Sequence, residues 1–251
     1  GVRVALWGRV GDDVNGHSYL HGLNLQGVST DFVRLVQGGQ TAFSTIVVDR
    51  YGERLVLPYY DPQLDASLDW LPLHQLNEAS AVHCDMRWPQ GSKVLLQAAK
   101  RAGVPSILDA DVAPFEDLRE LIPLADHLLF SQPAFELLEP IGSLHDNLRA
   151  VAKRTPAEVV GVTLGSEGAL IWRRETDDIE HYPGFEIRYT TGVFICFQDA
   201  RHGIDQGGTL LVFVATHPPE AFIDFLREID LKWRCGSKLM NGLHKPLLID
   251  L

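Results

Sequence analysis

Cysteine and long apolar runs are scarce in this sequence, and each scarcity disfavours a class of protein. The three cysteines, Cys84, Cys196 and Cys235, are far apart and form no Cys-x-x-Cys pair. A disulfide framework and a zinc site are therefore not expected, and a reducing, cytoplasmic location is favoured. No apolar run reaches the roughly 18 residues of a transmembrane helix, and no charged-then-apolar leader opens the chain.

Positive charge is also in short supply. There are 33 acidic against 22 basic side chains, which gives a formal net charge of −11, and no basic run occurs. Nucleic acid and membrane surfaces are therefore disfavoured as partners. The ten histidines show no metal-ligand spacing, so no protein-ligated metal is predicted. The 45% apolar content is enough for the core of one large α/β domain over residues 1–251.

Strand-like and helix-like segments alternate along most of the chain. This order is typical of an α/β protein with a mainly parallel sheet covered by helices. The expected strands are Val2–Trp7, Ser80–Cys84, Ser106–Leu108, His127–Phe130, Glu158–Val162 and Ala169–Trp172. The expected helices are Gly16–Leu25, Gln90–Ala102, Phe115–Leu121 and Leu144–Lys153. Further on, strands are expected at Val193–Phe197 and Thr209–Val214, and a helix at about Pro219–Lys232.

One segment, at about residues 40–60, breaks the alternation. Thr45–Asp49 and Glu53–Leu57 are β-branched or apolar runs that flank Arg50-Tyr51-Gly52. Two such runs around a short Gly-containing loop predict an antiparallel hairpin. We expect it to form a flap beside the main sheet.

Two Gly-containing segments can approach a ligand closely. In Val162–Gly168, glycines and the hydroxyls of Thr163 and Ser166 suit phosphate oxygens, although a plain hairpin turn is the alternative. Gly8–Gly16 is expected to be the loop after the first strand, at the edge where α/β sheets bind ligands. There the alternative is a helix cap by Asp12 or Asp13. Neither has Gly-x-Gly-x-x-Gly spacing, which disfavours an NAD-dependent oxidoreductase.

These segments together resemble the ribokinase-like (PfkB) carbohydrate kinases. Gly8–Gly16 is similar to that family's GxVGDDxxG element, and the hairpin, Leu108–Asp111 and Val162–Gly168 follow in the family's order. Thr190-Thr191-Gly192 is similar to the start of its DTTGAGD signature, so the resemblance covers about residues 1–192. Asp85–Gly91 also resembles the D-x-R-W-x-x-G stretch of sulfofructose kinases.

The resemblance implies a ribokinase-like three-layer αβα sandwich with a small β flap, or lid. It implies an enzyme that transfers the γ-phosphate of ATP to a hydroxyl of a sugar or sugar acid, with Mg²⁺ held mainly by nucleotide and water. It also implies a homodimer formed through the flap. The implied ATP-binding residues are Thr163, Gly165, Ser166, Gly168, Thr191, Gly192 and Ser131, with Gly192 opening the anion hole. The implied sugar-binding residues are Asp12, Arg87, Asp109 and Ser44.

The chain departs from the family pattern at both ends. The family's N-terminal strand with its sugar-binding Asp, and the Gly-Gly-x-x-Asn stretch after it, are not found. Ile195 stands where the signature has its general base, and Asp199 is the nearest carboxylate downstream, a weak candidate. Three explanations are open: an incomplete or altered sequence of a larger kinase, a non-catalytic sugar- or nucleotide-binding protein, or an enzyme with another base. The joint departure of both ends favours the first.

Overall fold

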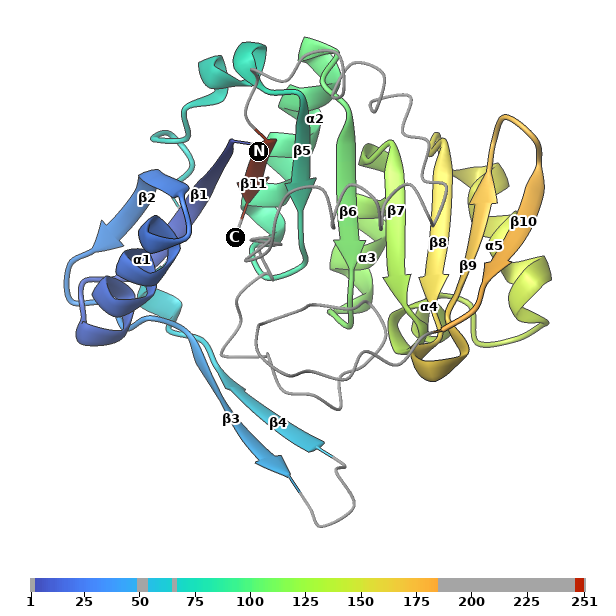
Figure 1. Ribbon diagram of the computed structural model, residues 1–251, viewed down its shortest axis with the longest axis horizontal. Coiled ribbons are helices and arrows are strands. Elements are labelled where there is room, and N and C mark those ends of the chain that lie inside the picture. The colour runs from blue at the N-terminus through green and yellow to red at the C-terminus, as the bar shows by residue number, and fades with distance from the viewer. Residues whose placement is uncertain (1–2, 49–53, 65–66, 185–246, 251) are drawn as a thin grey trace.

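The computed structural model describes residues 3–48, 54–64, 67–184 and 247–250, and these form one nine-stranded sheet and one two-stranded sheet (Figure 1). The strand order of the large sheet is β10-β9-β8-β7-β6-β5-β11-β1-β2. Its strands are β1 (Val4–Gly11), β2 (Val28–Val36), β5 (Ala81–Cys84), β6 (Ser106–Ala110), β7 (His127–Ser131), β8 (Val159–Thr163), β9 (Ala169–Arg173), β10 (Asp178–Tyr182) and β11 (Leu247–Asp250). The antiparallel pairs of this sheet are β8–β9 and β9–β10. The predicted α/β fold with a mainly parallel sheet is thus confirmed.

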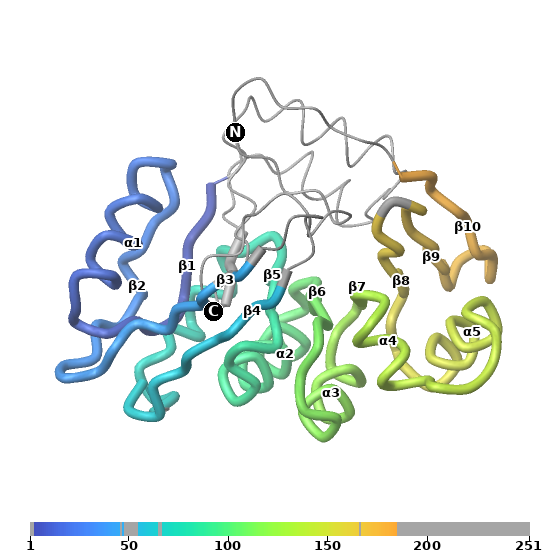
Figure 2. The backbone as a smooth tube through the Cα atoms, turned by 90° about the horizontal axis from the view of Figure 1, so that it is seen from below, coloured from blue at the N-terminus to red at the C-terminus, as the bar shows by residue number. Residues whose placement is uncertain are grey.

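Helices cover the sheet on both faces, as Figure 2 shows for α2, α3 and α5 on one side and α1 on the other. The described helices are α1 (Val14–Leu25), α2 (Pro89–Ala102), α3 (Phe115–Leu121), α4 (Gln132–Leu138) and α5 (Leu144–Arg154), with 3₁₀ turns at Pro62–Leu64, Leu73–Glu78, Ile122–Leu124 and Gly165–Glu167. Alternation along β1 explains the two layers. Leu6 packs with Leu23 beneath α1, whereas Ala5 and Trp7 belong to the main core.

Helix α2 shows how the sequence builds the main core. Its buried residues, such as Leu95 and Ala99, recur at helical spacing and face the sheet. Pro89 is tolerated in the first turn because that N–H has no partner within the helix. Gly103 ends the helix with φ of 66°, a left-handed conformation that favours glycine. The helix begins one residue before the predicted start.

The structure corrects the predicted loop at Gly8–Gly16. Residues up to Gly11 belong to β1, because β1 is longer than expected and pairs with β2 as far as Gly11 and Val36. Only Asp12 and Asp13 separate β1 from α1. Strands β2, β10 and β11 and helix α4 were not predicted. The elements expected beyond residue 192 lie outside the described residues. Strand β11 pairs in parallel with both β1 and β5.

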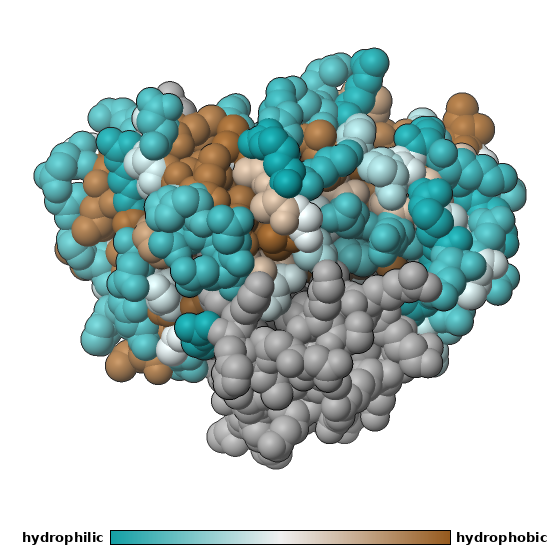
Figure 3. Space-filling model, turned by 90° about the horizontal axis from the view of Figure 1, so that it is seen from above, coloured by the Kyte–Doolittle hydropathy of each residue, from teal (hydrophilic) through white to brown (hydrophobic). Residues whose placement is uncertain are grey.

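The predicted hairpin is present as β3 (Phe43–Val48) and β4 (Arg54–Tyr59), an antiparallel pair that projects away from the large sheet (Figure 1). Its apolar side chains are largely exposed. Side chains on the face opposite the hairpin are mostly hydrophilic, with apolar ones gathered between them (Figure 3). None of the helices in the described ranges has the length and apolarity that crossing a bilayer requires.

Asp126 joins the starts of two neighbouring strands and should contribute measurably to stability. Its carboxylate accepts hydrogen bonds from the backbone N–H and the hydroxyl of Ser106, at 2.9 and 2.8 Å. We expect Asp126→Asn to lower the free energy of unfolding by about 1–2 kcal/mol, because charged acceptors form stronger hydrogen bonds. Urea denaturation measures this. The same change at exposed Asp31 should cost less than about 0.5 kcal/mol; equal losses would contradict the assignment.

Candidate functional site

Polar side chains gather where the parallel strands end. Asp85 follows β5, Asp109 and Asp111 lie at the end of β6 and just after it, and Ser131 and Thr163 are the last residues of β7 and β8. Ser131 and Thr163 are opposite one another in the strand register. Since parallel strands present their carboxyl ends at one edge of the sheet, residues from distant parts of the chain meet there.

Asp111 is the centre of this polar cluster. Its carboxylate accepts a hydrogen bond from the Arg87 guanidinium at 2.6 Å and another from the Ser131 hydroxyl at 2.8 Å. The backbone N–H of Arg87 donates to Asp85 at 2.8 Å. The sequence leaves Asp85, Asp109 and Asp111 open as partners of the Arg87 side chain, and the structure shows its ion pair with Asp111. These contacts bring the predicted residues Arg87 and Ser131 together.

Two carboxyl groups of the cluster hold their protons unusually tightly. Burial, together with the nearby Asp85 and Asp111 carboxylates, raises the pKa of Asp109 from 3.8 to about 7. Burial likewise raises the pKa of Asp85 to about 6, although the N–H and charge of Arg87 oppose the shift. Near neutral pH, Asp109 is therefore close to its titration midpoint, and it can donate as well as accept a hydrogen bond.

The turn after β8 has the backbone shape that its glycines permit. Gly165 and Gly168 have φ of 57° and 99°, and the N–H of Leu164 donates to the carbonyl oxygen of Gly168 at 2.7 Å. A Cβ at Gly168 would collide with backbone atoms of residues 182–184, so this glycine is also required for packing. The Thr163 hydroxyl donates to the Phe130 carbonyl oxygen at 3.3 Å. Ser166 lies in the short 3₁₀ helix of this turn.

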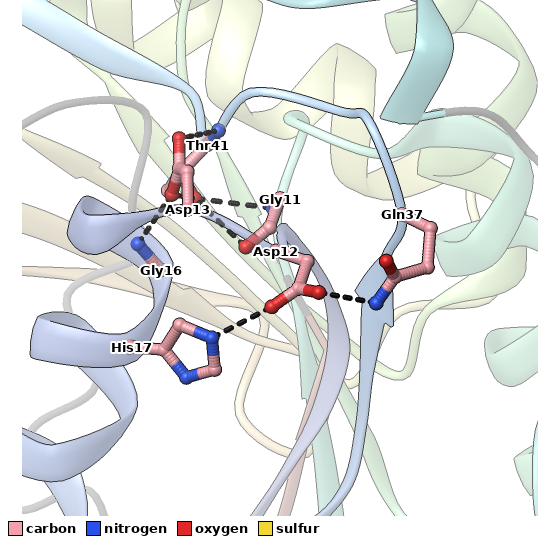
Figure 4. Close-up of polar contacts among 7 residues, drawn as sticks. All are labelled: Gly11, Asp12, Asp13, Gly16, His17, Gln37 and Thr41. Carbon is pink, nitrogen blue, oxygen red and sulfur yellow. Dashed lines mark hydrogen bonds and ion pairs between the residues drawn. The ribbon is translucent and has the colours of Figure 1, made fainter.

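The two acidic residues after β1 have different partners (Figure 4). Asp13 caps α1, accepting a hydrogen bond from the Gly16 N–H at 2.7 Å, which settles the choice of cap that the sequence left open. Asp12, expected on the sugar side, contacts the Nε2 atom of His17 at 2.6 Å and the Gln37 side-chain amide. The sequence did not indicate Gln37, which lies 25 residues further along the chain.

The remaining predicted residues lie elsewhere. Ser44 is partly buried on β3, opposite Pro58. Thr191, Gly192 and Asp199 lie outside the described residues. Within the ranges that are described, no three His, Cys, Asp or Glu side chains are grouped so that they could hold a metal ion.

A stack of rings and guanidinium groups lies beside the cluster and was not predicted. The Arg9 guanidinium is 4.0 Å from the ring centre of Trp88, and Trp70 stacks on Trp88 with centroids 5.9 Å apart. Trp88 is fully buried. It follows Arg87 directly, so packing of its ring helps to hold Arg87 at the edge of the sheet. Neither Arg9 nor Trp70 carries a local sequence signal for this contact.

Comparison with known proteins gives consistent matches. Residues 1–192 match the sequence model of the pfkB family carbohydrate kinases. An ATP-dependent ribose-1-phosphate kinase of Halopiger xanaduensis is 29% identical over 187 residues, which cover 74% of this chain and 61% of that protein. The chain therefore spans about three fifths of that relative's length.

Solved structures agree with this match. A candidate ribokinase from Agrobacterium tumefaciens is 34% identical, with a TM-score of 0.68 over 74% of this chain and 60% of that one. A candidate ribokinase II from E. coli, in complex with ATP and Mg²⁺, is 17% identical, with a TM-score of 0.64 over 75% of this chain and 64% of that one. At that identity the second match supports the fold only.

The raised pKa of Asp109 predicts a pH-dependent stability. In the unfolded chain this carboxyl ionises near its ordinary pKa of 3.8, whereas in the folded state it keeps its proton up to about pH 7. The free energy that folding loses by burying this carboxyl therefore grows as the pH rises from about 3.8 to about 7, and it reaches its full value above about pH 7. We expect Asp109→Asn to raise the free energy of unfolding by about 1–3 kcal/mol at pH 8 and to have little effect near pH 4.

Denaturation at both pH values measures this effect. Asp111→Asn is the control with the opposite sign, because Arg87 and Ser131 lose a charged acceptor. A stability gain for Asp109→Asn that is the same at both pH values would show that burial of its charge is not the cause.

Proposed function

The chain belongs to the pfkB family of carbohydrate kinases, and we propose that the whole protein transfers the γ-phosphate of ATP to a hydroxyl of a sugar or sugar acid. The observation that carries the proposal is the family match over residues 1–192, which includes the polar cluster at the carboxyl edge of the sheet. A cytoplasmic location belongs to the proposal and rests on the three widely separated cysteines.

Arg87 is the residue we assign to an acidic group of the substrate. Its side chain is 30% exposed at the edge of the sheet, and its ion pair with Asp111 orients the guanidinium fork. A guanidinium has five N–H donors, so it can bind a phosphate or sulfonate while Asp111 holds it in place. The similarity to a ribose-1-phosphate kinase and the resemblance of Asp85–Gly91 to sulfofructose kinases both favour an acidic sugar.

ATP would supply the phosphoryl group and lie against the turn after β8. The left-handed glycines Gly165 and Gly168 let the backbone approach phosphate oxygens, and Thr163 and Ser166 contribute hydroxyls. Thr191 and Gly192 would form the anion hole that stabilises charge on the transferring group. Ser131 is neutral and bonded to Asp111, which fits Mg²⁺ held mainly by nucleotide and water rather than by a protein cage.

A second candidate function has one observation in its favour. Ile195 occupies the signature position of the general base, and isoleucine cannot accept a proton. A non-catalytic protein that binds sugar and nucleotide would be the result, unless Asp199 takes the role of the base. Asp12, Asp109 and Ser44 remain our candidates for contacts to the sugar in either case.

An assay for ADP release distinguishes these functions. We expect ADP to form when the chain is incubated with ATP, Mg²⁺ and ribose 1-phosphate. We expect Arg87→Ala to raise the KM for this sugar about tenfold more than the KM for neutral ribose.

Asp199→Asn in the same assay should lower kcat at least about a hundredfold if Asp199 is the base. Thermal stabilisation by both ligands without ADP release would favour the non-catalytic protein. If the ligands neither stabilise the chain nor lead to ADP release, both functions are contradicted.

We also propose that the hairpin forms a homodimer. Seven large apolar or aromatic side chains of the hairpin and its base are between 38% and 58% exposed: Phe43, Val47, Leu55, Val56, Leu57, Tyr59 and Tyr60. A two-stranded sheet is marginally stable alone, and an apolar face of this kind favours association. A second copy presents the same surface, so the two hairpins can cover one another symmetrically.

Disrupting this surface should separate the subunits. We expect the unmodified chain to be a dimer and Leu57→Lys to be a monomer in light scattering at micromolar concentration, because a charge would enter an apolar interface. Leu137→Lys on α4 is the matched control, since Leu137 is 45% exposed on the main body. A monomeric unmodified chain would overturn the proposal.

A further inference from the structure

The base of the hairpin is bound to the two residues that separate β1 from α1. The segment after β2 turns back at Gly38 and runs past Gly11, Asp12 and Asp13 (Figure 4). The N–H of Asp12 donates to the Val36 carbonyl oxygen at 3.0 Å, which fixes the point at which the segment leaves β2. The hairpin therefore starts from a point attached to the first strand of the sheet.

Asp13 and Thr41 make the closest of these contacts. Thr41 donates its hydroxyl to one carboxylate oxygen of Asp13 at 2.6 Å and its backbone N–H to the other at 2.9 Å. The same hydroxyl accepts a hydrogen bond from the Gly11 N–H at 3.1 Å. Partial burial alone would raise the pKa of Asp13, but the hydrogen bonds from Thr41 and Gly16 outweigh it and the pKa is lowered. Asp13 is thus a charged acceptor that joins the helix to the hairpin.

The glycines of the Gly-Asp-Asp-x-x-Gly stretch leave room for this contact. A Cβ on Gly11 would lie 2.6 Å from the backbone nitrogen of Thr41, and a Cβ on Gly16 would lie 2.7 Å from its hydroxyl oxygen. Both distances are too short for any side chain. The spacing of the motif therefore matches a close approach of the hairpin base to the start of α1.

The returning strand of the hairpin is held as well. Buried Asp61 accepts hydrogen bonds from the N–H of Gln40 at 2.5 Å and of Gln63 at 2.9 Å, so it joins the outgoing and returning segments. Arg9 of β1 donates to the Leu64 carbonyl oxygen at 2.5 Å. The two segments are thus connected to each other, so a displacement at Thr41 moves both strands of the hairpin together.

We propose that Asp13 and Thr41 are positioning residues that set the direction in which the hairpin leaves the sheet. Their hydrogen bonds form a clamp between the N-terminus of α1 and the base of β3. The clamp holds the hairpin in one orientation relative to the carboxyl edge, where Arg87 and Asp111 lie. This inference concerns the chain without ligand, so it holds whether the protein phosphorylates a sugar or only binds one.

The competing explanation is that Asp13 is an ordinary helix cap. A cap stabilises α1 through the Gly16 N–H and leaves the orientation of the hairpin unaffected. Thr41→Val separates the two explanations, because it removes the hydroxyl from the clamp and leaves the Asp13–Gly16 cap unchanged. Thr41→Ser keeps the hydroxyl and should restore the clamp.

Distances between paired spin labels measure the orientation directly. One label is placed at Leu57→Cys on the hairpin and one at Lys100→Cys on α2, with Cys196 and Cys235 replaced by Ser. The labelled chain is diluted into an excess of unlabelled chain, so that distances are measured within one subunit although Leu57 lies on the proposed dimer surface. In Thr41→Val, we expect the fraction of molecules outside the original distance peak to rise about tenfold, because the clamped state now leaves buried polar groups unpaired. Thr41→Ser should keep the original peak. The body pair Lys100→Cys with Leu137→Cys should not change.

A second pair of variants tests the same contact sterically. A Cβ in Gly16→Ala presses on the Gly11 carbonyl oxygen and on the Thr41 hydroxyl, whereas a Cβ on Gly22 in the same helix meets nothing within 4 Å. Gly16→Ala should broaden the hairpin distance as Thr41→Val does, and Gly22→Ala should leave it unchanged. An unchanged hairpin distance in both Thr41→Val and Gly16→Ala would overturn the clamp. Equal broadening of the body pair would overturn it too, since the effect would then be general loss of structure.

Discussion

Parallel pairing of β5, β6, β7 and β8 is the constraint on which the candidate site depends. The register places Cys84 beside Leu108, Ala110 beside Phe130, and Ser131 beside Thr163. The residues that end these strands or follow them must therefore meet at one edge of the sheet. A slip of one residue in any of these pairs would turn its side chains to the other face and separate Asp111 from Ser131.

Charge balance in a partly buried place gives this edge its chemical character. Asp85, Asp109 and Asp111 lie around the guanidinium of Arg87, and burial makes ionisation of Asp85 and Asp109 unfavourable. Asp109 therefore keeps its proton up to a pKa of about 7, and Arg87 forms its ion pair with Asp111. A site of this kind can bind an acidic group through Arg87 and a hydroxyl through Asp109, which are the two features of an acidic sugar.

The Gly-Asp-Asp-x-x-Gly stretch shows how a correct motif can receive an incomplete interpretation. Its predicted place between a strand and a helix holds only for Asp12 and Asp13, because Gly11 ends β1 and Val14 begins α1, whereas the predicted helix cap is present. The role of Thr41 was out of reach, because it depends on a contact across 28 residues. Arg9 and Trp88 make a contact of the same kind, in which neither residue alone signals the other.

The sequence by itself determined the α/β class, the bounds of α1, α2, α3 and α5 to within about two residues, the hairpin and the family, because periodicity, glycines and motif order can be read along the chain. It also indicated most residues of the carboxyl edge, since each lies at the end of a strand or just after it. Only the tertiary structure decided that Arg87 pairs with Asp111, that Asp109 keeps its proton and that Asp13 holds Thr41. Hydrogen-bond geometry and burial depend on strands and loops that are distant in sequence, and the strand register brings them together.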